Sequence, residues 1–294
     1  MAYSVKPATS IDQQVALLKG RGLVIPDEGT ATAILQRISY YRLSRYLVDF
    51  KRLDDTYQPG TQLSTIYAIY EFDRRFRNLL LGMIEPIEIS IRTKIAQYLA
   101  VTCDPLAYRD STYFVDATEH GSQLAMIDAE IARSREPFAD HYRKYYGGTF
   151  PIWVAVEMMS FGSVSKMYSN LVRTHRQQIA KPHYGLTEKV ISQWLRSLVT
   201  ARNACAHFAR LYRRTPTFQP KICDDDRSDI PVPQSWFTVF MAARHLYEPW
   251  ADWGHFVTAL ETLCDEYRGV VDVRDMGFPS HWVHLLRRPC RRHP

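Results

Sequence analysis

The chain has 294 residues, of which 46% are hydrophobic and 23% are charged, and its formal net charge is +6. This composition is typical of an ordered globular protein and excludes a low-complexity or disordered chain. No apolar run reaches the ~20 residues that span a bilayer, and neither an apolar core nor a small-residue cleavage site follows Lys6. We therefore expect a cytoplasmic protein that does not enter a membrane.

Residues 1–60 predict a lead of short helices. Ser10 followed by Gln13 is typical of a capping box, and the helix that it opens should run to Gly20 or Gly22. A second helix should begin at Pro26-Asp27-Glu28. Aromatic and basic residues then alternate: Tyr40, Tyr41, Arg42, Arg45, Tyr46 and Phe50. Such a cluster could stack RNA bases, although aromatic residues at helical spacing more often belong to a core.

A long helical pattern begins near Leu63, after the Pro59-Gly60 turn. Apolar residues recur at helical spacing on both sides of Pro86. Because proline removes a helical hydrogen bond, we expect it to kink this helix or to start a second one. Cys103-Asp104-Pro105 should end the pattern, and residues 105–118 are predicted as a loop.

The second half of the chain predicts further helices and almost no strand. The expected helices lie near 119–134, 137–146, 151–159, 161–171, 187–209, 234–250 and 253–269. An acidic loop is expected at 220–233, and a coil-like end follows the last helix. We therefore predict one all-α domain over 1–294, with a helical lead at 1–60, a core at 61–270 and a basic tail at 271–294. The tail, with Arg287, Arg288, Arg291 and Arg292, should be a mobile arm that adds nonspecific RNA affinity.

The cysteines and histidines give little sign of a metal or redox site. The five cysteines are scattered and never spaced as C-x-x-C, which argues against a disulfide framework and a thiolate zinc site. Only His281 and His284 approach metal-ligand spacing, and two ligands near the end of the chain do not make a site. We expect no metal and no cofactor.

Positive charge is concentrated in the second half of the chain. Residues 1–150 carry 18 basic and 18 acidic side chains, whereas residues 151–294 carry 19 and 13. The segment 189–223 contains seven basic residues and no acid. This segment indicates either a surface for a polyanion such as RNA or a solvated helix face whose acidic partners lie elsewhere in the fold.

The strongest candidate for a catalytic site is the segment Arg202-Asn203-Ala204-Cys205-Ala206-His207. It ends a predicted amphipathic helix, on which Asn203 and His207 share a face at i, i+4. A histidine can exchange a proton with a ribose hydroxyl near neutral pH, and an arginine can stabilise charge on a phosphate. A symmetric dimer could supply the second histidine that acid–base catalysis needs. On these residues alone, a structural histidine at a packed helix end is the more ordinary interpretation.

Glu88 and Arg92, also at i, i+4, allow two interpretations. They could orient the catalytic arginine or histidine from a neighbouring helix. They could equally form a surface ion pair that contributes only ~0.3–0.5 kcal/mol.

The chain resembles the abortive-infection proteins of the AbiD/AbiF type, which are classed with the HEPN ribonucleases. The resemblance follows the chain in order, through Lys6-Pro7, Ser10–Gln14, Leu17–Leu23, Ile38–Ser44, Ile69–Arg75, Ile84–Glu88, Arg92-Thr93, His141-Tyr142, Pro151–Trp153, Glu157–Gly162, Ser192–Leu195, Arg202–His207 and Met276–Pro279.

This resemblance implies an all-helical HEPN-like bundle and metal-independent cutting of RNA in phage defence or toxin–antitoxin control. Arg202 and His207 match the catalytic pair, Asn203 the polar residue beside them, and Glu88 and Arg92 polar positions of the paired helix. Some relatives are associated with a structured noncoding RNA. The chain departs from the family pattern at Phe208, where a second histidine is common, and at Arg213-Arg214, within a stretch that commonly reads R-L-W-N-R.

Three hypotheses follow for the function. The first is a HEPN endoribonuclease that acts as a homodimer or with a bound RNA. The second is a non-catalytic RNA-binding defence module, and the third, which the basic charge disfavours, is a helical protein-interaction module. For either RNA hypothesis the predicted phosphate contacts are Arg196, Arg210, Arg213, Arg214 and Lys221.

Overall fold

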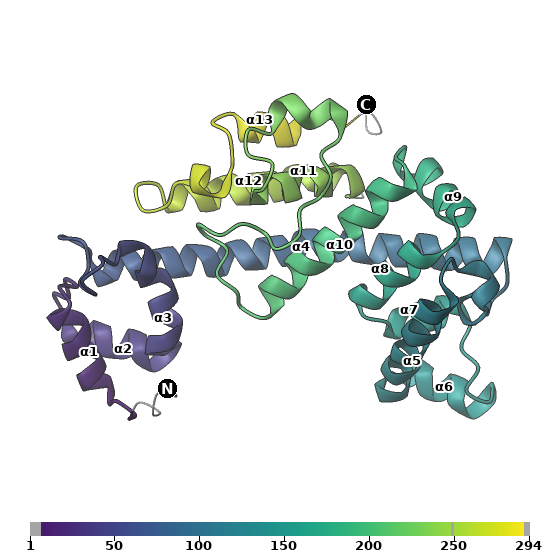
Figure 1. The fold of residues 1–294 in the computed structure, drawn as a ribbon, viewed down its shortest axis with the longest axis horizontal. Coiled ribbons are helices and arrows are strands. Elements are labelled where there is room, and N and C mark those ends of the chain that lie inside the picture. Colours follow the sequence, from purple (N-terminus) through teal and green to yellow (C-terminus); the bar gives the residue numbers. More distant parts are fainter. Residues whose placement is uncertain (1–6, 248–249, 291–294) are drawn as a thin grey trace.

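The computed structural model describes residues 7–247 and 250–290 (Figure 1). Lys6, Arg291 and Arg292, which figured in the sequence predictions, lie outside the described residues. Within those ranges the chain is helical and contains no strand, only isolated bridges such as Val24 with Gln62. The predicted all-α class is confirmed.

The N-terminal helices form one group at an end of the molecule (Figure 1). They are α1 (Ile11–Gly20), α2 (Glu28–Ile38) and α3 (Tyr40–Leu47), followed by a 3₁₀ turn, η1 (Val48–Phe50). The predicted capping box is present, because the Gln13 amide donates to Ser10 Oγ at 3.2 Å and the Ser10 amide donates to Gln13 Oε1 at 2.8 Å. Of this group, α3 packs directly on α4 (Leu63–Thr102).

Helix α4 runs through the whole molecule as the axis on which the other groups pack (Figure 1). It is a single helix of 40 residues, so Pro86 neither ends it nor starts a second helix. Met83, Ile84 and Ile87 are buried around the proline. Burial of each such side chain contributes about 1.5–3 kcal/mol, which offsets the ~3 kcal/mol cost of an interior proline.

Five helices form a group at the C-terminal half of α4, and the last three of them pack directly on it (Figure 1). They are α5 (Ala117–Arg133), α6 (Pro137–Tyr145), α7 (Ile152–Met158), α8 (Phe161–Asn170) and α9 (Arg173–Tyr184). Two 3₁₀ turns, η2 (Ala107–Arg109) and η3 (Ser111–Tyr113), interrupt the predicted loop. The sequence did not predict α9, because this polar helix buries only Ile179, Ala180 and Tyr184 and therefore has a weak apolar pattern.

The remaining helices lie along the middle of α4. Helix α10 (Glu188–Ala206) packs on α4 and α8, and α11 (Trp236–Leu246) and α12 (Trp250–Glu266) lie on another side of α4. The predicted coil-like end instead contains η5 (Val273–Met276) and α13 (Trp282–Arg287). No helix in the described ranges is long and apolar enough to cross a membrane.

The prediction of a mobile basic arm is wrong for Arg287 and Arg288. Arg287 forms an ion pair with Glu261 at 3.0 Å, and Arg288 pairs with Asp229. The Cys290 side chain is buried. The Arg287 and Arg288 side chains are therefore held by acids from α12 and from η4 (Asp224–Asp229).

A buried ionic cluster joins η4 to α11 and α13. Asp226 accepts hydrogen bonds from Arg244 Nη2 and His245 Nε2, both at 2.7 Å, and Arg244 also donates to the carbonyl of Leu285. Burial is the largest single effect on His245 and opposes its protonation, but the hydrogen bonds to Asp226 and Cys290 and the negative charge of Asp226 together outweigh it and raise the pKa of the imidazole to about 9. The cluster therefore contains a protonated histidine at neutral pH.

This raised pKa predicts that the free energy of unfolding depends on alkaline pH. His245 has a higher proton affinity in the folded than in the unfolded chain. Its contribution is therefore complete below the ordinary histidine pKa of 6.5 and is lost as the pH rises through about 9. Melting temperatures between pH 6 and pH 9.5 should fall for the native protein and fall less for His245→Gln. Equal slopes for the two proteins would contradict a protonated His245.

Candidate active site

Helix α10 carries the predicted motif at its C-terminal end. The Thr187 hydroxyl caps its first turn by accepting from the Val190 amide at 3.4 Å. A face that includes Trp194, Leu198 and Cys205 is buried. Burial raises the pKa of the Cys205 thiol to about 12, so this side chain remains a neutral packing group and is not a nucleophile.

The helix ends in a tight reversal at His207 and Phe208. His207 is the C-cap, Phe208 has a left-handed backbone with φ of 57°, and the Ala209 amide donates to the Ala204 carbonyl at 2.8 Å. The Phe208 amide donates to the Cys205 carbonyl at 3.0 Å, which completes a Schellman motif. Glycine usually occupies the left-handed position, and another residue pays roughly 1–2 kcal/mol there.

The three predicted catalytic side chains all lie on the solvent face of this helix end. Arg202, Asn203 and His207 are exposed. Nowhere in residues 7–247 and 250–290 does another group hydrogen-bond to or form an ion pair with these side chains. Their donors and acceptors are therefore available to a ligand.

Arg196 extends the same stripe toward the start of α10. Positions 196, 203 and 207 are related by 7 and 11 residues, which places them on one side of a helix. Arg196 is exposed, and its guanidinium lies 4.2 Å from the centroid of the Phe218 ring. At 1.5 Å per residue, about 16 Å of helix axis separates Arg196 from His207.

A buried carboxylate holds the chain that follows the motif. Asp73 of α4 is fully buried and accepts from the amides of Leu211 and Tyr212 at 3.0 and 2.9 Å. It also accepts from Tyr46 Oη at 2.7 Å and pairs with Arg77 at 2.8 Å. Burial raises the pKa of the Asp73 carboxyl, and the Arg77 guanidinium opposes that rise. The Asp73–Arg77 pair thus fixes the backbone just beyond the motif against α3 and α4.

A cleft of about 560 Å³ opens beside the end of α10. Its lining comes from α3, from α4 and from the motif end, and consists of Arg42, Tyr70, Arg74, Arg77, Asn78, Leu81, Cys205, Ala206 and Phe208. Arg74, Asn78 and Leu81 had not been predicted as site residues. Helical spacing could have grouped them on one stripe of α4, but the sequence gave no sign that α10 ends over that stripe.

Glu88 and Arg92 form an ion pair that lies away from the motif. Their side chains are 13% and 15% exposed, so the pair is mostly buried. Arg92 also donates to the carbonyl of Met159 at 2.8 Å, at the junction of α7 and α8. In the described structure neither side chain forms a hydrogen bond or an ion pair with Arg202 or His207. The pair connects α4 to that junction, and its burial contradicts the interpretation as a solvated surface pair.

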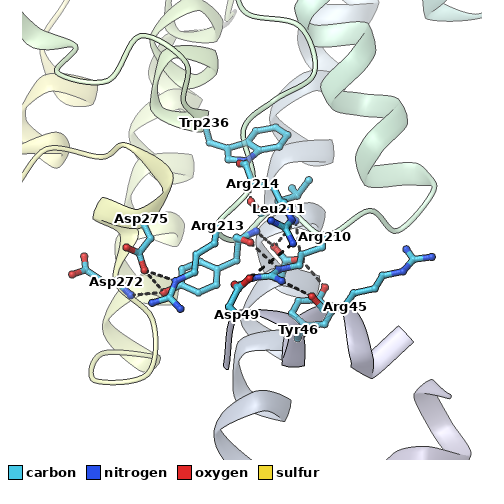
Figure 2. Close-up of polar contacts among 12 residues, drawn as sticks. Arg45, Tyr46, Asp49, Arg210, Leu211, Arg213, Arg214, Trp236, Asp272 and Asp275 are labelled. Atoms are coloured by element: carbon cyan, nitrogen blue, oxygen red, sulfur yellow. Dashed lines mark hydrogen bonds and ion pairs between the residues drawn. The ribbon is translucent and has the colours of Figure 1, made fainter. Parts of the chain in front are cut away.

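The predicted phosphate contact Arg210 is wrong, because its side chain is only 5% exposed. Figure 2 shows its guanidinium enclosed by Arg45, Tyr46 and Asp49. It pairs with the Asp49 carboxylate, donates to the Arg45 carbonyl and donates from Nε to the Tyr212 carbonyl at 3.0 Å. The buried Arg210 side chain therefore connects the segment that follows α10 to α3 and η1.

The other predicted contacts differ in how they are held. Arg213 pairs with Asp275 at 2.8 Å and is 40% exposed (Figure 2). Arg214 lies 3.9 Å from Asp49 and is 51% exposed. Lys221, like Arg196, is exposed and has no ion-pair partner among the described residues. Arg196, Lys221 and the half-exposed Arg214 can still reach a phosphate.

A comparison with protein-family models matched the Abi-like protein family over residues 33–213. The chain belongs to the Abi-like protein family. The matched segment runs from α2 to the residue that follows the backbone held by Asp73, and so includes the motif and the cleft of this Abi-like protein. Family membership indicates abortive-infection defence against phage. Comparisons with curated proteins and with solved structures gave no match.

The described residues of this Abi-like protein contain no group of three or more histidine, cysteine, aspartate or glutamate side chains that could hold a metal ion.

Removing the Asp73 carboxylate should destabilise the protein strongly. Asp73→Ala leaves Arg77 buried without its partner, which should lower the free energy of unfolding by about 3–5 kcal/mol. The matched control is Tyr46→Phe, which removes one hydrogen bond to the same carboxylate and should cost about 1 kcal/mol. Urea unfolding measures both, and similar small losses would show that Asp73 does not anchor this region.

Proposed function

We propose that this Abi-like protein is a metal-independent endoribonuclease of the HEPN type that acts as a defence toxin in abortive infection. The observation that supports the proposal is that the polar side chains of the motif are exposed and have no partner among the described residues. Arg210, Arg213 and Arg214 nearby have acidic partners. Arg202, Asn203 and His207, in contrast, are exposed and unpartnered within the described structure. A structural histidine at a packed helix end would be buried or bonded.

The motif residues supply the groups that cutting RNA requires. His207 takes the proton of a ribose 2′-hydroxyl, and the 2′-oxygen attacks the adjacent phosphorus. The bond from phosphorus to the 5′-oxygen breaks, and that oxygen is protonated by a second acid. The products are a 2′,3′-cyclic phosphate and a 5′-hydroxyl end. Arg202 stabilises the charge on the phosphate during the attack, and Asn203 donates to a phosphate oxygen or to a ribose.

A symmetric homodimer would complete the acid–base pair. The motif of one chain presents one imidazole, whereas the reaction uses a base and an acid. A twofold axis near the exposed end of α10 would place the His207 side chains of two copies on opposite sides of one phosphate. The exposure of the motif leaves room for such a partner.

A second candidate function is RNA binding without cutting, with a structured noncoding RNA as partner. The single imidazole of one chain favours it, and so does the stripe from Arg196 to His207, which presents donors to a phosphate backbone over about 16 Å of helix. In this alternative Arg202 and His207 bind phosphate, and the RNA restrains or scaffolds the protein.

Substitution of the motif should remove function without removing the fold. Arg202→Ala and His207→Ala should each abolish phage protection or growth inhibition, because each removes one of the two chemical roles. Melting temperatures should stay within a few degrees, since both side chains are exposed. The matched controls are Arg135→Ala and His255→Ala, at exposed positions away from α10. Full protection by a folded His207→Ala protein would contradict catalysis.

The revised set of phosphate contacts predicts a division between binding and stability. Arg196→Gln and Lys221→Gln should each flatten the slope of log affinity against log salt by roughly 0.7 on single-stranded RNA. Arg210→Gln should instead lower the melting temperature, because its guanidinium is buried on Asp49. If Arg210→Gln changed the salt slope and left the melting temperature unchanged, the assignment of these roles would be reversed.

A further inference from the structure

Phe208, next to the proposed catalytic histidine, is an exposed aromatic residue with an unfavourable backbone conformation. Its side chain is 60% exposed, and its φ of 57° lies in the left-handed region that glycine adopts most easily. The hydrophobic contact that often accompanies a Schellman motif involves other positions, here Ala204 and Ala209. Phe208 therefore contributes little to the cap that it occupies.

Arg42 of α3 contacts both the backbone and the ring of Phe208. The Arg42 guanidinium donates from Nη1 to the Phe208 carbonyl at 3.2 Å, and it lies 5.5 Å from the centroid of the Phe208 ring. The contact fixes the backbone and places a cation against the ring. The ring is thus oriented although most of it faces solvent.

Helix α3 carries a second aromatic–arginine pair. Tyr41 is 76% exposed, and the Arg45 guanidinium lies 5.8 Å from its ring centroid. Tyr46 and Arg210, in contrast, are buried. The aromatic and basic cluster of α3 therefore divides into a buried part, with Tyr46, and a more exposed part, of which Arg42 contacts Phe208.

Phe208 also borders the cleft that contains Arg74 and Asn78. Phe208 follows His207 directly and both side chains are exposed, so a base that neighbours a phosphate bound at His207 is within reach of the Phe208 ring. Exposed aromatic faces beside basic groups are what single-stranded RNA-binding sites use to stack bases.

We propose that Phe208 is the stacking platform for the nucleobase next to the scissile phosphate, with Arg42 as its positioning residue. The inference rests on the proposed function for the location of that phosphate. It adds that the protein recognises unpaired RNA through its bases as well as through its backbone. Stacking tolerates any base, so the preference is for unpaired RNA and not for one sequence.

Phe208→Gly is a direct test, because glycine suits the left-handed position and should preserve the fold. Full-length protein with His207→Ala, which leaves the RNA intact, is compared with the double variants that add Phe208→Gly or Phe208→Trp. The probes are a single-stranded RNA oligonucleotide and an abasic ribose-phosphate chain of equal length. Phe208→Gly should weaken binding of the RNA by roughly 10-fold or more and leave binding of the abasic chain unchanged. Phe208→Trp should retain the affinity for RNA.

The melting temperature of Phe208→Gly should be unchanged or higher. Equal affinity of the Gly and Phe proteins for RNA would overturn the proposal, as would an equal loss on both probes. Conversion of a dimer to a monomer by Phe208→Gly in sedimentation would also overturn it, because Phe208 would then be a contact between copies. The proposed function fails separately, if protein with native His207 leaves RNA uncut while the difference between the probes persists.

Discussion

The buried Asp73–Arg77 pair determines where the candidate site lies. Asp73 accepts from the backbone of Leu211 and Tyr212, and Arg77 donates to the carbonyl of Ala209 at 3.0 Å. The chain that leaves α10 must therefore turn back onto α4 at once. The left-handed Phe208 makes that turn, and the turn leaves Arg202, Asn203 and His207 facing solvent. The ion pair thus fixes the backbone that follows the motif, while the motif side chains remain accessible to solvent.

Much of the fold follows from local signals in the sequence. Three predicted helices are present in the structure: the one that the capping box at Ser10 opens, the long one from Leu63 and the one that carries the motif. The failures have physical causes. Pro86 is accommodated because packing on both sides of it outweighs a lost hydrogen bond, and α9 has too few apolar residues to give a period. The folded tail depends on Glu261 and Asp229, acids distant in sequence that no local pattern reveals.

The site could be predicted in part. Residue types and spacing picked out Arg202, Asn203 and His207, which are exposed on one helix end. A run of basic residues, however, cannot show which of them are buried. Arg210 lies in the acid-free segment, yet it pairs with Asp49 from 161 positions earlier in the chain. The cleft was also hidden, because its lining combines α3, α4 and the end of α10. Charge patterns therefore indicated a candidate region, and tertiary contacts show which of its basic side chains are buried.

The central claim is that Arg202 and His207 cut RNA without a metal ion. The most direct measurement is to incubate purified native and His207→Ala proteins with RNA in excess EDTA and to determine the chemistry of the new ends. The account predicts cutting by the native protein alone, with 2′,3′-cyclic phosphate and 5′-hydroxyl ends. Cutting that stops in EDTA and returns with magnesium or manganese would contradict it, and so would equal cutting by His207→Ala.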